Sequence, residues 1–187
     1  MRQRSSHSLA RLLVVGMVIG GAAMMLPTAA NAEAGGVNIR SPHSGDRSMQ
    51  LDVHAGFSHF GLGVAAGARF SIPIMDNGFV RSINNAVYIN FGGDFYWVKH
   101  GSDYSPAVGI PITLNWEFTF SRTWSLFAEL GVNVYLHPRL FKGDGWDWSP
   151  GHWVIGAIGA RLHFNDNIAL VLRLGNPYSA FGVTFSF

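Results

Sequence analysis

Charged and histidine side chains recur at alternate positions of this chain, among residues that are mostly small or apolar. Two of these spacings are Asp52-x-His54 and Arg161-x-His163. Alternate residues of a β-strand point to the same side, so each pair would share one strand face. Acids and bases on a common face can form ion pairs, and buried charges are tolerated only when paired and hydrogen-bonded. We predict one interior polar network, made of Asp52, His54, Arg69, Asp94, Glu117, Glu129, Arg161, His163 and Arg173.

One ion pair of this network follows from antiparallel register. Gly145 is the midpoint of the connection between the alternating segments 124–137 and 152–164. If the connection is symmetric about that residue, Glu129 lies beside Arg161 on the interior face. The sequence therefore predicts a Glu129–Arg161 salt bridge near the middle of the two strands.

Serine, histidine and an acid also occur near one another, and these are the residue types of a hydrolase triad. His163 is close to Asp166, and Ser125 and Ser179 lie near the ends of alternating segments. Triads are recognised by geometry, and no spacing in this chain matches a known motif of that chemistry. We therefore predict no catalytic residues and no enzyme activity.

A further group of side chains lies between two of the alternating segments, around Asp144 and Asp147. Together with His137 and His152 they could bind a divalent metal, and two neighbouring tryptophans could stack on a sugar. Their spacing is irregular, and a loop need not bring them together. The sequence predicts neither a metal site nor a cofactor, and it leaves adhesion through this loop open.

The elements that position these residues are eight segments with the period of two that strands show, and no convincing helical period. The clearest runs from Ala107 to Phe118, where large apolar residues alternate with Gly, Pro, Thr, Asn and Glu. Each of the longer segments exceeds the 9–11 residues or so that a tilted strand needs to cross a membrane. The segments are Met49–Phe57, Phe60–Ile72, Ala86–Lys99, Ala107–Phe118, Trp124–His137, His152–Phe164, Ile168–Leu174 and Tyr178–Phe187.

Residues 1–32 have the features of a cleaved secretory signal peptide. Arg2, Arg4 and Arg11 precede an apolar stretch, and Ala30-Asn31-Ala32 is a small-x-small cleavage site. The apolar stretch Leu12–Leu26 is shorter than the 20 or so residues that a retained membrane anchor needs. We expect the processed chain to begin after Ala32.

Removing this segment changes the charge balance and defines the domains. Three of the 13 basic residues lie within it and all 11 acidic residues lie outside it, which leaves 10 basic and 11 acidic residues. This balance gives no support for nucleic-acid binding. The chain has no cysteine, which excludes disulfides and thiol chemistry. We expect a flexible lead-in at 33–48, rich in Gly, Ser and Pro, followed by one β-domain at 49–187.

The apolar strand faces could point inward, as in a soluble lipocalin-like barrel with a ligand cavity, or outward into lipid. The positions of the lysines favour apolar faces that point outward into lipid. The only lysines are Lys99 and Lys142, at a segment end and in a connection, whereas water-exposed strand faces usually collect Lys and Glu. The other faces carry mostly Gly, Ala, Ser, Thr and Asn, which suit the interior of a narrow barrel of eight strands.

The last segment has aromatic residues on one face, small residues on the other, and a phenylalanine at its end. With a signal peptide and eight amphipathic segments before it, the chain resembles the small bacterial outer-membrane β-barrel proteins of the OmpA/OmpX-like kind. The resemblance is architectural and covers nearly all of the processed chain. It implies an all-β fold, namely an eight-stranded antiparallel up-and-down transmembrane β-barrel in the outer membrane of a Gram-negative cell. The residues expected to form its assembly signal are Phe181, Val183, Phe185 and Phe187.

The resemblance also implies partners and a range of functions. The expected partners are the barrel-assembly machinery during biogenesis, and membrane lipid and lipopolysaccharide afterwards. The protein is expected to be a monomer. Because this fold hosts many activities, we expect a structural or surface-interaction role. The alternatives are a lipid A-modifying enzyme and a channel for small hydrophobic molecules. Pro111 favours the channel, because proline removes a ladder hydrogen bond and marks either a bulge or a break in the wall.

Connection lengths bear on orientation. With both ends of the domain in the periplasm, we expect short periplasmic turns at 121–122 and 165–167. The long outer loops would then be 100–106 and 138–151. The connection 73–85 is long for a periplasmic turn.

Overall fold

The computed structural model describes residues 37–59, 63–100, 103–136 and 154–187. The chain divides into two compact units, of which the first is Met1–Ala34. The expected signal peptide belongs to that first unit and lies outside the described residues. The second unit holds the β-domain.

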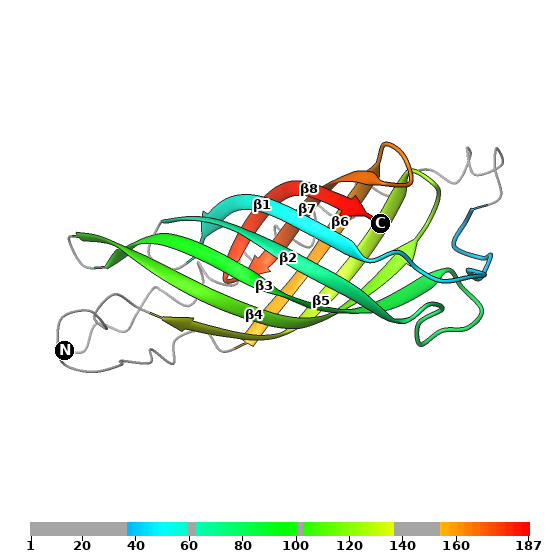
Figure 1. The fold of residues 1–187 in the computed structure, drawn as a ribbon, viewed down its shortest axis with the longest axis horizontal. Helices are drawn as coiled ribbons and strands as arrows, with labels where there is room; N and C mark the ends of the chain where they lie inside the picture. The colour runs from blue at the N-terminus through cyan, green and yellow to red at the C-terminus, as the bar shows by residue number, and fades with distance from the viewer. Residues whose placement is uncertain (1–36, 60–62, 101–102, 137–153) are drawn as a thin grey trace, which may run out of the picture. The chain divides into compact units, whose positions relative to one another are not determined.

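Within the described residues, eight strands form one closed antiparallel barrel (Figure 1). Each strand pairs with the next along the chain, and β8 closes the wall by pairing with β1. The expected all-β, eight-stranded, up-and-down architecture is therefore confirmed. In the part of the chain that is described, no helix is long and apolar enough to cross a membrane. The strands are β1 (Gln50–Ser58), β2 (Gly63–Met75), β3 (Asn85–His100), β4 (Asp103–Thr119), β5 (Trp124–Leu136), β6 (Val154–His163), β7 (Ile168–Asn176) and β8 (Tyr178–Ser186).

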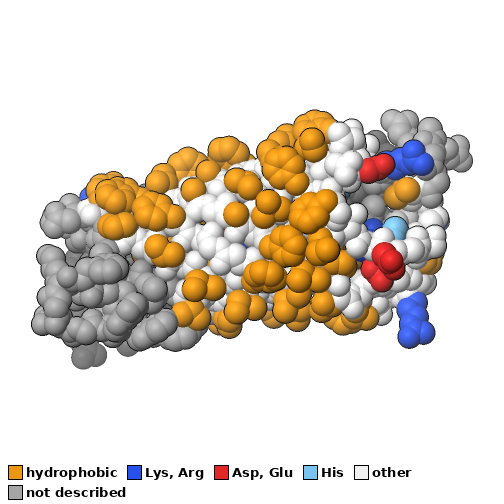
Figure 2. All heavy atoms as spheres, viewed as in Figure 1, with side chains coloured by type: hydrophobic (Ala, Val, Ile, Leu, Met, Phe, Trp, Pro, Cys, Tyr) orange, Lys and Arg blue, Asp and Glu red, His pale blue; other side chains and the backbone are white. Residues whose placement is uncertain are grey.

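The period of two in the sequence becomes two chemically different faces of the wall. In β4, Ile110 and Leu114 are 52% and 49% exposed on the outside, while Thr113 and Asn115 are buried on the inside. Figure 2 shows the result on one face, where hydrophobic side chains cover the wall and the visible charged ones gather toward one end. The core is thus polar and the outer surface apolar, the reverse of a water-soluble domain.

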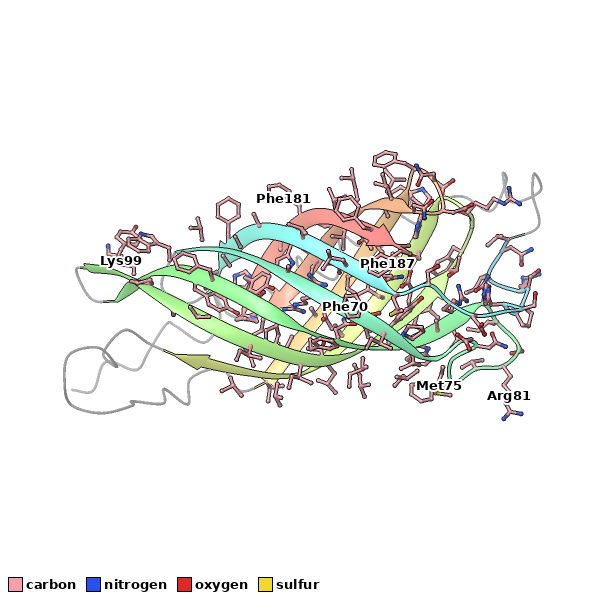
Figure 3. All side chains as sticks on the ribbon, viewed as in Figure 1. Phe70, Met75, Arg81, Lys99, Phe181 and Phe187 are labelled. Atoms are coloured by element: carbon pink, nitrogen blue, oxygen red, sulfur yellow. The ribbon has the colours of Figure 1, made fainter. Side chains whose placement is uncertain are left out.

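The two ends of the barrel differ in their connections. Phe187 and the connections 76–84, 120–123 and 164–167 lie at one end, which we call the C-terminal end. Lys99 and the strand ends Ser58, Gly63 and Asp103 lie at the opposite end, which we call the Lys99 end (Figure 3). Both short turns expected from the sequence are present at the C-terminal end, each slightly longer than expected.

The prediction of a long loop at 100–106 is wrong. β3 continues to His100 and β4 begins at Asp103, and Pro106 itself pairs with Trp97 inside the hairpin. Ser105 and Pro106 are residue types typical of a loop, yet both take part in the strand pairing. Cross-strand contacts, which a single segment does not reveal, outweigh local turn preference at this point.

The segment before β1 contacts the C-terminal end. The Arg47 backbone N–H donates to Asp76 Oδ1, and Arg47 Nε donates to the Asp76 backbone oxygen, both at 3.0 Å. Arg47 also donates to Asn84 Oδ1, while the Asn84 N–H donates to the Ile39 backbone oxygen at 2.7 Å. The described part of the expected lead-in is thus hydrogen-bonded to the connection between β2 and β3.

Pro111 neither inserts a residue nor separates β4 from β5. Its pairing with β5 is continuous. Pairing with β3 is interrupted between Phe91–Ile112 and Asp94–Gly109, and it resumes in the same register. The sequence left open a bulge or a break in the wall at this proline. No residue is inserted there, and the missing proline N–H interrupts one ladder locally.

Candidate functional site

The lumen holds all nine residues of the predicted polar network. They come from every strand except β8, and eight of the nine are buried. Arg69, Arg161 and Arg173 are at most 1% exposed, which is unusual because arginine is almost never fully buried without a partner. His163, at the C-terminal end, is half-buried.

Seven of these residues form one chain of alternating acids and arginines. At its centre, Glu129 Oε1 accepts from Arg69 Nη1 at 2.5 Å, and Oε2 accepts from Arg173 Nε at 2.8 Å. Arg69 is on β2 and Glu129 on β5, so the chain crosses the lumen between strands that are not neighbours. Its order is Asp94–Arg69–Glu129–Arg173–Asp52–Arg161–Glu117, with N–O distances between 2.5 and 3.4 Å.

The chain has four carboxylates and three guanidiniums, and neutral donors add further hydrogen bonds to the carboxylates. Thr184 Oγ1 donates to Asp52 at 2.5 Å, Thr113 Oγ1 to Glu129 at 2.7 Å, and the Tyr178 hydroxyl to Asp94 at 2.9 Å. In a low-dielectric interior such satisfaction decides whether a polar network is stable. Each carboxylate is therefore held as a structural acceptor.

The two histidines lie at opposite ends of this chain. His54 Nε2 is 3.2 Å from Asp94 Oδ1 and 2.7 Å from the Tyr178 hydroxyl. His163 Nε2 is 3.0 Å from Ser125 Oγ, which in turn donates to Glu117 at 2.6 Å. Each imidazole therefore lies beside the carboxylate at its own end of the chain. His54 contacts Asp94 directly, and His163 is linked to Glu117 through the Ser125 hydroxyl.

Three aromatic residues of the network were missed from the sequence. Tyr178 donates to Asp94 and accepts from Arg69 Nη2 at 2.8 Å, and Tyr96 donates to Asp94 at 3.0 Å. The Phe127 ring lies against two guanidiniums of the chain, whose carbons are 4.7 and 5.6 Å from its centre. The position of Phe127 in the sequence could have identified it, because it alternates with Ser125 and Glu129 on the inward face of β5.

The predicted Glu129–Arg161 salt bridge is wrong. Glu129 bonds to Arg69 and Arg173, whereas Arg161 bonds to Glu117 Oε2 at 2.6 Å and to Asp52. The cross-strand neighbour of Glu129 is Ala157, and that of Arg161 is Ser125. Register is set by strand pairing around the closed wall, and the midpoint of a long connection does not determine it.

Among the described residues, two serine–histidine pairs occur, and neither has the geometry of a hydrolase. Ser125 Oγ gives its single proton to Glu117, so His163 Nε2 can only donate to that oxygen and cannot act as its base. The acid in a triad orients the histidine, whereas here it binds the serine. The second pair, His59 Nε2 and Ser179 Oγ at 3.1 Å, is exposed at the Lys99 end. Among the described residues no carboxylate bonds to His59.

The residues of the expected assembly signal follow one face of β8. Phe181, Phe185 and Phe187 are exposed on the outer wall, and Val183 is half-buried between them. β8 pairs along its length with β1, and the Phe187 N–H extends this ladder by donating to the Met49 backbone oxygen at 3.0 Å. The terminal phenylalanine is thus fixed against the first strand.

The remaining candidates lie outside the described residues. These are the loop expected at 138–151 and the aspartates, histidines and tryptophans considered there for metal or sugar binding. Within the described ranges, no three or more His, Cys, Asp or Glu residues form a group suited to a metal ion. No protein-family model matches the chain, and no curated protein matches its sequence.

Proposed function

We propose that this chain is a bacterial outer-membrane β-barrel, secreted by a cleaved signal peptide, with a structural or surface-interaction role and no enzyme activity. The observation that carries the proposal is the inverted polarity of the barrel. Three arginines and four carboxylates are buried in its centre, while large apolar side chains such as Leu130, at 66%, are exposed on its outside. Such a wall is stable in lipid, where apolar side chains need no water.

The dimensions of the barrel support this proposal. All backbone groups of a membrane-spanning sheet must be paired, and closure of β8 on β1 leaves no free edge. The strands have 9 to 17 residues, against about 9–11 needed to cross a bilayer at a tilt. Lipid and lipopolysaccharide around the wall, the assembly machinery acting on the terminal strand, and a monomeric state are part of the same proposal.

The alternatives have less support. A soluble lipocalin-like barrel needs an apolar cavity, whereas the buried interior of this barrel is mainly polar and charged. A channel needs a continuous passage, whereas ion pairs cross this lumen between β2 and β5 and between β1 and β6. A lipid A-modifying enzyme needs an activated nucleophile, and the two serine–histidine pairs lack that geometry.

A single charge on the wall tests the proposal. Leu130 is at the midpoint of β5 on the outer face, and Leu130→Arg should cost about 2–4 kcal/mol of unfolding free energy in lipid vesicles if this face meets the bilayer centre. Thr123→Arg, in an exposed connection at the C-terminal end, is the matched control and should cost almost nothing. The measurement is urea unfolding in vesicles, followed by the difference in gel mobility between unboiled and boiled protein.

The same pair of variants can refute the proposal. If the outer wall faces water, an exposed leucine replaced by arginine changes stability by no more than about 0.5 kcal/mol. Equal stability of Leu130→Arg and Thr123→Arg, or recovery of the protein as a soluble species without detergent, would show that the barrel does not span a membrane.

A further inference from the structure

A groove crosses the outer wall at the Lys99 end. Its volume is about 290 Å³, and its walls are mostly apolar. Cross-strand pairing of Phe57 with Val64, and of Val64 with Trp97, makes a continuous row over β1, β2 and β3. The groove is lined by Phe57, Ser58, Gly63, Val64, Trp97 and Tyr104.

The large side chains of this groove are open to the surroundings. Phe57 is 68% exposed and Tyr104 is 54% exposed, with Val64 and Trp97 between 43% and 51%. Trp97 also stacks on Phe95, at 6.5 Å between ring centres, which extends the apolar surface along β3 toward the middle of the wall. The groove is therefore continuous with the apolar outer face of the barrel.

Lys99 lies at the outer edge of this groove. Lys99 lies directly opposite Tyr104 in the β3–β4 hairpin, two residues beyond Trp97 on the same face (Figure 3). In the described part of the chain, no carboxylate pairs with its ammonium group. The other exposed cations described, Arg81 and Arg122 among them, lie at the C-terminal end. An exposed positive charge next to aromatic rings, at the end of an apolar wall, is complementary to an anionic amphipathic molecule.

We propose that this groove binds one anionic phospholipid. Its acyl chain lies against Phe57, Val64 and Trp97, and its phosphate meets the Lys99 ammonium group. The phenol of Tyr104 and the indole of Trp97 are suited to the boundary between apolar chain and polar headgroup. The inference rests on the proposed function, because only a barrel inserted in a bilayer presents this groove to lipid.

The test compares two lipids with identical acyl chains, a diacylglycerol phosphate and a diacylglycerol phosphocholine. The full folded protein is titrated with each in detergent micelles, and bound lipid is counted by native mass spectrometry. Because one lysine near a charged lipid surface is worth about 1 kcal/mol, wild type should retain the phosphate lipid about fivefold more strongly. Inorganic phosphate is the third ligand, and it should not compete at equal concentration.

Four variants assign the effect. Lys99→Gln should abolish the preference between the two lipids, while Arg122→Gln, a cation at the C-terminal end, should preserve it. Trp97→Ala should weaken retention of both lipids, while Phe164→Ala, an aromatic residue 64% exposed at the other end, should not. Gel mobility before and after boiling establishes that each variant is folded.

The outcomes separate this inference from the proposed function. Equal retention of both lipids by wild type, an unchanged preference in Lys99→Gln, or full competition by inorganic phosphate overturns the lipid site and leaves the membrane barrel intact. Failure of the wild-type protein to insert into vesicles overturns both. If the control variants Arg122→Gln and Phe164→Ala reduce lipid retention as much as Lys99→Gln and Trp97→Ala do, lipid is held by the whole wall. That result also overturns the site.

Discussion

Removing the Glu129 carboxylate should be the most damaging single change in the lumen. This carboxylate accepts hydrogen bonds from Arg69, Arg173, Thr113 and Asn90 at distances of 2.5 to 3.1 Å. In Glu129→Ala, both guanidiniums stay buried and each keeps a single acidic partner, at 3.4 Å for Arg69 and 3.1 Å for Arg173. The variant thus leaves two buried guanidinium N–H groups, at Arg69 Nη1 and Arg173 Nε, without the acceptor that Glu129 provides.

The size of the loss follows from what breaking a buried ion pair costs. Removing one partner of such a pair typically destabilises a protein by about 3–5 kcal/mol, and Glu129 has two partners, so we expect the upper part of that range. Glu129→Gln keeps the shape and one acceptor oxygen, and we expect it to lose less than Glu129→Ala. The measurement is the free energy of unfolding from reversible urea titrations in lipid vesicles, followed by tryptophan fluorescence.

A pair of double-mutant cycles tests the geometry itself. Glu129 contacts Arg173, and residues in direct contact show coupling energies of about 0.5–3 kcal/mol. Glu129 and Arg161 belong to the same chain without sharing a bond, so their coupling should be smaller. If the coupling of Glu129 with Arg161 equals or exceeds that with Arg173, the order of the ion-pair chain is wrong.

Three further outcomes are expected. Phe127→Leu should cost about 2 kcal/mol, because it removes a ring that lies 4.7 Å from the Arg161 guanidinium; a loss below 0.5 kcal/mol in the same titration contradicts this. Phe187→Asp should lower the amount assembled in the outer membrane more than it lowers the stability of the refolded barrel, whereas Phe164→Asp, also at the C-terminal end, should spare assembly; normal assembly of Phe187→Asp contradicts a role as a signal. Desolvation and the nearby Arg47 lower the pKa of His43 below its usual 6.5. Protonation therefore favours release of the segment before β1, and hydrogen exchange of its amides, corrected for intrinsic rates, should rise as pH falls from 8 to 5 while strand amides stay protected.

The faces of the strands could be predicted because they depend on local information. A period of two needs only the segment itself, and in β4 it assigns Thr113, Asn115 and Glu117 to the inside correctly. The choice of outside for the apolar face needed one more fact, the shortage of lysine. Strand ends were less predictable, and the β3–β4 hairpin extends through Pro106 because pairing with β3 continues beyond the local turn signal.

The partners within the lumen could not be predicted, because they depend on strand stagger and on contacts across the barrel. Arg69 on β2 meets Glu129 on β5, which are 60 residues apart in the chain. Tyr178 joins the network from the first position of β8, where a sequence gives no sign that its hydroxyl points at Arg69 and Asp94. Such contacts follow from closure of the sheet and its tilt, which no single segment specifies.

Side-chain size explains how so many charges fit in a lumen of eight strands. Long inward residues stand opposite glycines: His54 lies between Gly67 and Gly182, and Arg173 lies opposite Gly159. A Cβ on Gly67 would collide with the Asp94 carboxylate, and one on Gly159 with the Phe127 ring. Because a barrel of this width has room for side chains and little else, glycine at these positions makes room for the long side chain on the neighbouring strand.

The register of β5 and β6 differs from the one that the midpoint of their connection predicted. Crowding alone does not exclude Glu129 opposite Arg161, because Asp52 lies directly opposite Arg69 in the same lumen. The observed pairing instead sets Ala157 opposite Glu129 and Ser125 opposite Arg161, so that both charged groups extend across the barrel to partners on distant strands. Even Asp52 and Arg69, which lie opposite each other, form their ion pairs with residues of other strands. The ion pairs of this lumen therefore depend on the register of the whole barrel, and direct cross-strand neighbours need not be partners.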